Sequence, residues 1–161
     1  MVTIFSGKIG SGKTTRLWEW SKKGKSVGGI LMPLVSGKRY FYSVSSGETY
    51  QAEIDKDEYN GEIVNIGRYS FSDRGFIRAN GEIIESFQKY KNIIIDEIGP
   101  LELFGKGFYY SLKNILENKK SLNNKNLIIV IREGMIEKIV DYFNLENYSV
   151  VRKVSEIFST S

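Results

Sequence analysis

The sequence of 161 residues contains no cysteine and no histidine. Without these residue types the chain can form no disulfide, no zinc site of cysteine and histidine ligands, and no thiol nucleophile. Because no imidazole is present either, any general base must be a carboxylate, a lysine or a water molecule. The lack of cysteine also fits a reducing compartment.

Long apolar runs are absent as well. No segment approaches the roughly 18 consecutive apolar residues that a membrane-spanning helix requires, and no basic leader precedes an apolar stretch at the N-terminus. We therefore expect a cytoplasmic protein with no membrane partner. The chain shows no repeat, no low-complexity stretch and no linker, so we predict a single domain over residues 1–161, as a monomer or a weak oligomer.

The chain has a small excess of positive charge, +4 at pH 7, which could favour polyanions such as nucleotides or nucleic acid. Its basic residues form short, separate clusters at residues 22–25, 38–39 and 119–120. Because each cluster lies at an expected element end or turn, solvated surface explains them better than a nucleic-acid groove. Nucleic acid is therefore the less favoured partner.

One motif stands out near the N-terminus. Residues 7–14 read Gly-Lys-Ile-Gly-Ser-Gly-Lys-Thr, a complete phosphate-binding loop, between a β-rich run at 2–5 and a helical segment from Gly12 to Lys23. Glycines in such a loop let consecutive N–H groups form an anion nest, and the helix N-terminus adds its positive dipole end. We expect Lys13 to contact the β- and γ-phosphates and Thr14 to ligate Mg²⁺, with a nucleoside triphosphate as substrate. The predicted binding residues are Gly7, Lys8, Ile9, Gly10, Ser11, Gly12, Lys13, Thr14 and Thr15.

The rest of the chain alternates apolar runs with amphipathic segments. The runs at 93–95 and 127–131 suit strands buried on both faces of a parallel sheet. Residues 27–35 suit a further buried strand, and arms at 39–44 and 49–54 predict an antiparallel hairpin. Further strands are expected at 63–66 and 148–154, and helices near 83–90, 108–116 and 136–143. The pattern predicts an α/β fold: a doubly wound, mainly parallel sheet with an antiparallel hairpin addition.

Two adjacent carboxylates follow the apolar run at 93–95. In an open α/β sheet, the carboxyl ends of the strands face the ligand crevice. We expect Asp96 to accept a hydrogen bond from Thr14 and to hold Mg²⁺ together with it. Glu97, one residue further on, can orient and polarise a water molecule in line with the γ-phosphate. Because a kinase must keep water away from that position, Glu97 favours hydrolysis.

Catalysis also requires positive charge close to the γ-phosphate. Arg132 directly follows the run at 127–131 and should emerge at the same edge of the sheet, where it could clamp the γ-phosphate; a surface arginine at the start of a helical turn is the alternative. The predicted catalytic residues are therefore Lys13, Glu97 and Arg132. Weaker arginine candidates are Arg68, Arg74 and Arg78.

A longer motif surrounds the two carboxylates. Residues 93–103 read Ile-Ile-Ile-Asp-Glu-Ile-Gly-Pro-Leu-Glu-Leu, and the Asp-Glu-Ile-Gly-x-x-Glu-Leu portion resembles the hallmark of the small P-loop nucleoside triphosphatases, a family that includes the vertebrate cancer-related NTPase and its archaeal and bacterial relatives. The segment Ile66-Gly67-Arg68-Tyr69 is similar to a Gly-x-Tyr element of that family. The chain departs from the family's pattern at residues 32–35 and 74–78.

This resemblance extends over most of residues 1 to about 145 and carries several implications. It implies a RecA-like parallel core. It also implies Mg²⁺-dependent hydrolysis of several nucleoside triphosphates to the diphosphate and phosphate, with a loose base preference. In this chain the counterparts of the family's phosphate, metal and water-activating positions would be Lys13, Thr14, Asp96 and Glu97.

Two other functions stay open from the sequence. A small nucleotide or nucleoside kinase would use the tyrosine-rich hairpin as part of an acceptor site. A nucleotide-dependent nucleic-acid-binding module would use the basic clusters, and its binding would weaken steeply with salt. For the nucleobase, Phe104 or Tyr109 could offer a stacking surface, although core packing is the favoured interpretation of both.

Overall fold

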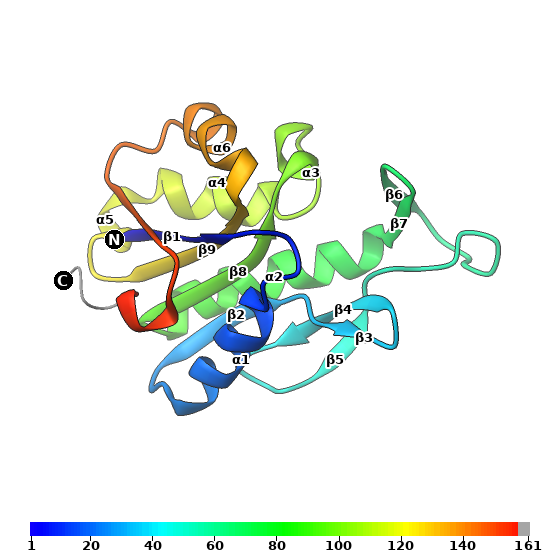
Figure 1. The fold of residues 1–161 in the computed structure, drawn as a ribbon, viewed down its shortest axis with the longest axis horizontal. Helices are drawn as coiled ribbons and strands as arrows, with labels where there is room; N and C mark the ends of the chain where they lie inside the picture. Colours follow the sequence, from blue (N-terminus) through cyan, green and yellow to red (C-terminus); the bar gives the residue numbers. More distant parts are fainter. Residues whose placement is uncertain (158–161) are drawn as a thin grey trace.

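A mostly parallel sheet forms the centre of the molecule (Figure 1). The structure is a computed structural model that describes residues 1–157. In spatial order the strands are β10 (Tyr148–Val151), β1 (Val2–Gly7), β9 (Asn126–Arg132), β8 (Asn92–Ile98), β2 (Val27–Leu31), β4 (Lys38–Ser43) and β3 (Leu34–Val35), and β5 (Thr49–Gln51) also pairs with β4. The strands from β10 to β2 pair in parallel, whereas β4 runs antiparallel to its neighbours. The predicted parallel core with an added hairpin, β4–β5, is confirmed.

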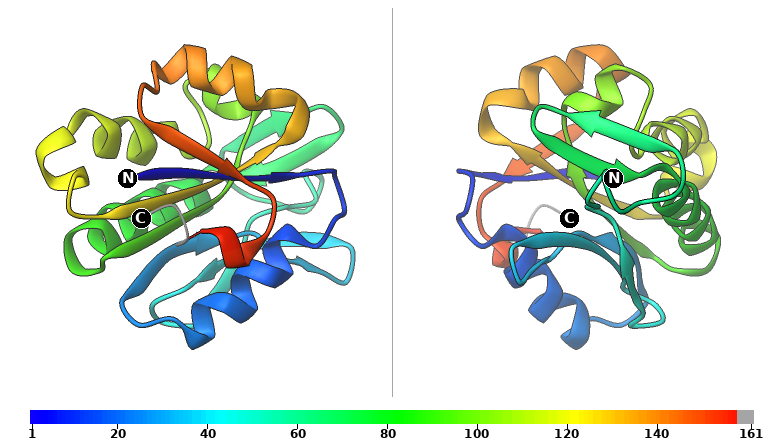
Figure 2. Two further views of the ribbon diagram at one scale, coloured as in Figure 1. Left: turned by 60° about the vertical axis from the view of Figure 1, so that its left-hand side comes forward. Right: turned by 90° about the vertical axis from the view of Figure 1, so that its right-hand side faces the viewer.

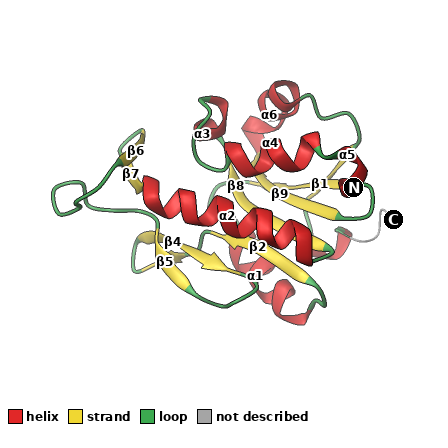
Figure 3. Cartoon of the chain, turned by 180° about the vertical axis from the view of Figure 1, so that it is seen from behind, coloured by secondary structure: helices red, strands yellow, loops and turns green. Residues whose placement is uncertain are grey.

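Helices cover both faces of this sheet, which is the doubly wound arrangement that the sequence predicts. In Figure 3, α2 and α4 lie in front of the sheet, whereas α1 lies behind it. The helical elements are α1 (Lys13–Lys23), α2 (Asp73–Lys89), α3 (Pro100–Leu103), α4 (Tyr109–Glu117), α5 (Lys119–Leu122) and α6 (Ile136–Phe143), with 3₁₀ turns η1 (Glu133–Met135) and η2 (Val154–Glu156). The short helices α3 and α5 are not apparent from the sequence periodicity.

Each face of the sheet buries its own set of apolar side chains, because successive residues of a strand point to opposite faces. Ile93 and Ile95 of β8 pack into the core that α2 and α4 share, whereas Ile94 packs with Leu17 of α1. All three isoleucines have an exposed fraction of 0%. The run at 127–131 is buried in the same way, so both strands predicted to be covered on two faces are confirmed.

The predicted apolar strand over residues 27–35 is wrong beyond Leu31, where β2 ends. The backbone N–H of Met32 donates to Asp96 Oδ2 (3.2 Å), a contact with a side chain rather than with a neighbouring strand. Pro33 follows and has no N–H to donate. The buried strand therefore stops at the carboxyl edge of the sheet, next to the acidic end of β8.

The next residues instead form a β-hairpin. Leu34–Val35 make the exposed strand β3, which pairs antiparallel with the start of β4. Between them, Ser36 and Gly37 have φ angles of 49° and 81°. Two consecutive residues with positive φ are typical of the tight type I′ turn, which matches the twist of the flanking strands. Hydrophobicity alone does not reveal this reversal.

A small two-stranded sheet, β6 (Ile63–Ile66) and β7 (Tyr69–Ser72), lies apart from the central sheet (Figures 1 and 2). The first of these strands is predicted, whereas β7 is not. Helix α2 begins directly after β7, where the Gly75 N–H donates to Ser72 Oγ (3.0 Å). Such an N-cap satisfies one of the free N–H groups at the start of a helix.

The last strand is shorter than the predicted range 148–154. β10 ends at Val151 because the N–H groups of Arg152 and Lys153 donate to Glu156 Oε2 (3.0 and 3.2 Å) in η2. The assignment of residues 1–161 to one domain stays a prediction, and residues 158–161 lie outside the described part of the chain. Among residues 1–157, no helix has the length and apolar character needed to cross a membrane.

Candidate active site

The loop between β1 and α1 lies at the carboxyl end of the parallel strands, the end that faces the viewer in the right-hand view of Figure 2. Gly10 and Gly12 have φ angles of 73° and 80°. An L-residue, which carries a Cβ, is strained in this left-handed region, whereas glycine is not. A Cβ at Gly7 would lie 3.1 Å from Ser11 Oγ, so the loop also folds closely on itself. These backbone requirements explain the glycine spacing of the motif.

Lys13 is the first residue of α1 and has an exposed fraction of 7%. Its Nζ donates to the carbonyl oxygens of Gly7 (3.2 Å) and Lys8 (3.0 Å), which holds the ammonium over the loop. The first turn of α1 has no side-chain cap and no acidic residue. Because helix N-terminal N–H groups and the helix dipole favour negative charge, this end of α1 suits a phosphate group. The side chains of Ile9 and Thr15, which the sequence also places in the binding set, are exposed.

The hydroxyl of Thr14 joins the loop to the acidic end of β8. Thr14 Oγ1 donates to Asp96 Oδ2 (2.7 Å), which also accepts the N–H of Met32 (3.2 Å). Asp96 has an exposed fraction of 1%, and this burial raises the pKa of its carboxyl group to about 6. The sequence-predicted pair of Thr14 and Asp96 is therefore in direct contact.

The oxygen set of this pair fits Mg²⁺. Within the described residues, Asp96 Oδ1 is buried and has no hydrogen-bond partner. A buried carboxylate oxygen without a partner is unfavourable unless a ligand or ion supplies one. Mg²⁺ prefers oxygen ligands and is usually held by one or two carboxylates together with substrate phosphates. Thr14 Oγ1 and Asp96 Oδ1 are thus suitable to hold a magnesium ion beside the loop.

The second acidic residue, Glu97, pairs with Arg132. Arg132 Nε donates to Glu97 Oε1 (3.1 Å), and both side chains are partly exposed. Arg132 is also the parallel-sheet partner of Gly7, since β9 lies between β1 and β8. The three strand ends therefore bring the phosphate-binding loop, an arginine and a carboxylate to one edge of the sheet, as the sequence predicts.

A buried glutamate organises the segment that follows β8, and its role escapes sequence reasoning. Glu102 has an exposed fraction of 2% and accepts the N–H groups of Gly99 (2.7 Å) and Phe108 (2.9 Å). Burial raises the pKa of its carboxyl group to about 7. The sequence does contain a signal for this contact: Glu102 is the third residue of α3, and a glutamate at that position commonly accepts a hydrogen bond from the N-cap N–H, here that of Gly99.

Among the contacts of residues 1–157, no hydrogen bond or ion pair joins the weaker arginine candidates to the loop. Arg78 stacks over the ring of Tyr50 (3.9 Å to the centroid) and pairs with Glu48 (2.7 Å). Arg68 donates to the hydroxyl of the adjacent Tyr69 (2.9 Å). Arg74 is exposed in the first turn of α2.

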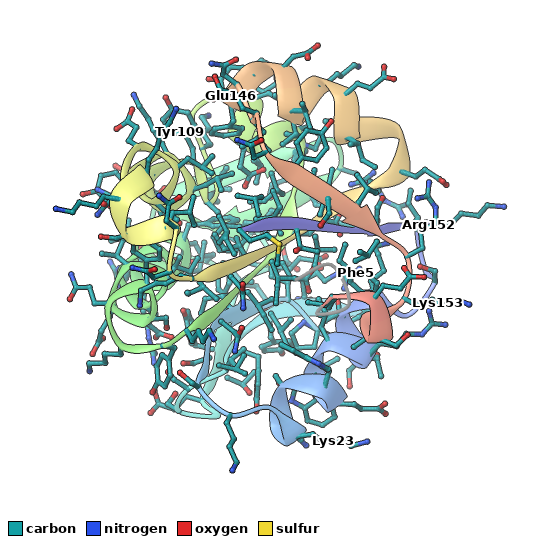
Figure 4. The ribbon with its side chains drawn as sticks, turned by 90° about the vertical axis from the view of Figure 1, so that its left-hand side faces the viewer. Phe5, Lys23, Tyr109, Glu146, Arg152 and Lys153 are labelled. Atoms are coloured by element: carbon teal, nitrogen blue, oxygen red, sulfur yellow. The ribbon has the colours of Figure 1, made fainter. Side chains whose placement is uncertain are left out.

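The two aromatic candidates for base stacking differ in environment. Phe104 follows α3 and has an exposed fraction of 81%, so the expectation that it packs in the core is wrong. Tyr109 lies on α4 (Figure 4) and packs against Tyr142 and Phe143 of α6. It lines a cavity with Met1, at the amino end of β1, away from the phosphate-binding loop.

The doubly wound sheet, with a phosphate-binding loop on β1 and a carboxylate at the end of β8, defines a P-loop NTPase. The fold is similar to that in the crystal structure of THEP1 from the hyperthermophile Aquifex aeolicus, with a TM-score of 0.71 and 23% sequence identity. That likeness covers 99% of this chain and 93% of the other.

Sequence comparison then places the chain in a family. Residues 2–157 match the family described as NTPase. The nucleoside-triphosphatase THEP1 of Pyrococcus abyssi is 34% identical over 125 residues, which cover 73% of this chain and 69% of that protein. The nucleoside-triphosphatase THEP1 of Korarchaeum cryptofilum is 26% identical over 161 residues, which cover 86% of this chain and 83% of that protein. The chain belongs to the NTPase family and is an NTPase.

Proposed function

We propose that this protein hydrolyses several nucleoside 5′-triphosphates, ATP and GTP among them, to the diphosphate and inorganic phosphate with Mg²⁺ as cofactor. The observation that carries this proposal is the contact between Thr14 and Asp96 (2.7 Å), with Glu97 as the next residue on the same strand. Asp96, which would hold the metal, and Glu97, which would orient water, are thus adjacent residues next to the phosphate-binding loop. The relatives that bear the name nucleoside-triphosphatase support the reaction class.

The residues have separate tasks in this reaction. Lys13 and the N–H groups of the loop bind the β- and γ-phosphates, while Thr14 and Asp96 would hold Mg²⁺. When bound, the ion would neutralise charge on the phosphate oxygens. Glu97 orients a water molecule and accepts its proton as the water oxygen bonds to the γ-phosphorus and the bond to the β-phosphate oxygen breaks.

Arg132 serves two purposes in this proposal. Its Nε holds Glu97 Oε1 (3.1 Å) and so limits the orientations that the carboxylate can adopt. Its position beside Gly7 also brings positive charge to the edge where the γ-phosphate would lie, which suits a clamp on that group. We accordingly propose that residues Asp96–Leu103 are the functional signature of the chain. We also propose that the enzyme discriminates only weakly between nucleobases.

Release of free phosphate by the purified protein tests the proposal. Each of ATP, GTP, CTP and UTP is supplied with Mg²⁺ or with a chelator, and with or without RNA or DNA. We expect Mg²⁺-dependent phosphate release from several of the four and little effect of the polynucleotide. Phosphate transfer that requires an added nucleoside or nucleotide would favour a kinase instead, and strong, salt-sensitive stimulation by RNA or DNA would favour a nucleic-acid-binding module.

A further inference from the structure

A second arginine lies at the carboxyl edge of the sheet, on the side of Asp96 that faces β2. Arg39 belongs to β4, and its Nη1 donates to the carbonyl oxygen of Met32 (2.9 Å). The N–H of the same Met32 donates to Asp96 Oδ2 (3.2 Å). A single residue therefore links the guanidinium to the carboxylate that contacts Thr14.

The backbone of Arg39 is held firmly in place. Its N–H donates to Glu53 Oε2 (3.0 Å), and its carbonyl accepts the N–H of Glu53 (3.0 Å). The tight turn at residues 36–37 connects it to Leu34, its pairing partner in β3. In Figure 1 this hairpin and the loop after β1 lie at the same end of the sheet. A side chain on a paired strand is better positioned than one on a free loop.

The ion pairing of Arg39 differs from that of the other arginines at the carboxyl edge of the sheet. Among the ion pairs of residues 1–157, Arg132 pairs with Glu97 and Arg152 pairs with Glu133 at the same edge, but Arg39 pairs with no carboxylate. Its side chain is nevertheless partly buried. A partly buried guanidinium that donates to a backbone carbonyl, with further N–H groups left over, is well suited to an anionic ligand.

We infer that Arg39 is a catalytic residue that donates hydrogen bonds to the γ-phosphate of the triphosphate held by the loop. The inference rests on the proposed function for the place of the triphosphate. Arg39 would approach from the β2 side and Arg132 from the β9 side, so the γ-phosphate oxygens would meet positive charge on both flanks. The planar guanidinium can donate two parallel hydrogen bonds to a phosphate, and these strengthen as charge develops in the transition state.

The test compares Arg39→Ala with Lys38→Ala, which removes the adjacent, exposed positive charge on the same strand. Affinity is measured for a non-hydrolysable triphosphate and for the corresponding diphosphate, both with Mg²⁺, and phosphate release is measured in parallel. We expect Arg39→Ala to weaken triphosphate binding by roughly tenfold or more, to leave diphosphate binding unchanged, and to lower kcat by roughly 10²- to 10³-fold. Lys38→Ala should behave as the wild type.

A purely structural role for Arg39 predicts a different pattern. Loss of a tether to Met32 would weaken diphosphate and triphosphate binding alike, and this equal loss would overturn the inference, as would unchanged affinities and kcat. Arg39→Lys, which keeps the charge, should recover part of the triphosphate preference. If the wild type releases no phosphate but Arg39→Ala still loses only triphosphate affinity, hydrolysis fails as the function while the γ-phosphate contact stands.

Discussion

Arg132 Nε donates to Glu97 Oε1 across 3.1 Å, so the ends of β9 and β8 are joined by an ion pair at the phosphate-binding edge. The parallel register places Arg132 beside Gly7, the first residue of the loop. The carboxylate proposed to orient water is therefore tied to the strand that adjoins the loop. In the proposed mechanism, Arg132 therefore connects the residue that orients water with the loop that binds the triphosphate.

Replacing Glu97 should affect turnover far more than binding. Glu97→Gln removes the proton acceptor but keeps the size of the side chain, so we expect kcat to fall by roughly 10²- to 10⁴-fold with little change in triphosphate affinity. Lys13→Ala should instead weaken the affinity for the triphosphate, because it removes the positive charge that contacts the phosphates. Phosphate-release kinetics and calorimetric titration with a non-hydrolysable analogue distinguish the two, and undiminished turnover in Glu97→Gln would remove its proposed role.

Arg132→Ala should slow hydrolysis because it frees Glu97 and removes positive charge from the γ-phosphate side. We expect kcat to fall by roughly tenfold to a hundredfold. The matched control is Arg152→Ala, which breaks an ion pair with Glu133 (2.7 Å) just after β10, on the other side of β1 from β9 (Figure 4). If both variants lose activity equally, general electrostatics at this edge rather than the contact with Glu97 would explain the effect.

The parts of this molecule that could be predicted from the sequence depend on local pattern. The glycine spacing in residues 7–14 dictates a loop, and an apolar run that ends in Asp96 and Glu97 indicates a buried strand with its acidic end at the ligand edge. Arg132 follows from the same argument about strand ends. In each case the residues adjacent in the sequence are sufficient to predict the local structure and its place at the ligand edge.

The roles of Arg39 and Glu102 depend on contacts that no local pattern contains. Arg39 reaches Met32 because β2 ends early and the chain reverses, whereas continuous hydrophobicity predicts one longer strand. Glu102 is buried because two backbone N–H groups converge on it, one of them six residues later in the chain at Phe108. Both features follow from tertiary packing, which overrides the periodicity of the sequence.

Asp96→Asn should greatly reduce the stabilisation by Mg²⁺ and triphosphate without destabilising the metal-free protein. At pH 8 the wild-type carboxylate is ionised, although burial raises its pKa to about 6, and its Oδ1 has no hydrogen-bond partner among the described residues. The neutral amide avoids that buried charge, so we expect its Tm without metal to be at least that of the wild type. Mg²⁺ with a non-hydrolysable triphosphate should raise the Tm of the wild type and of the exposed control Asp57→Asn, but raise that of Asp96→Asn far less. An equal rise in all three would contradict the metal site.

Glu102 should make the protein less stable as the pH rises. Burial raises the pKa of its carboxyl group from 4.5 to about 7 in the folded state. Between these values the folded protein holds a proton that the unfolded chain releases, so the free energy of unfolding falls with increasing pH and levels off above about pH 7. Glu102→Gln cannot titrate, and the stability of the wild type relative to this variant should therefore decline from pH 5 to pH 8. Urea unfolding of both proteins at each pH measures this difference, and a difference that stays constant from pH 5 to pH 8 would show that the two N–H donors offset burial and keep the folded pKa from rising.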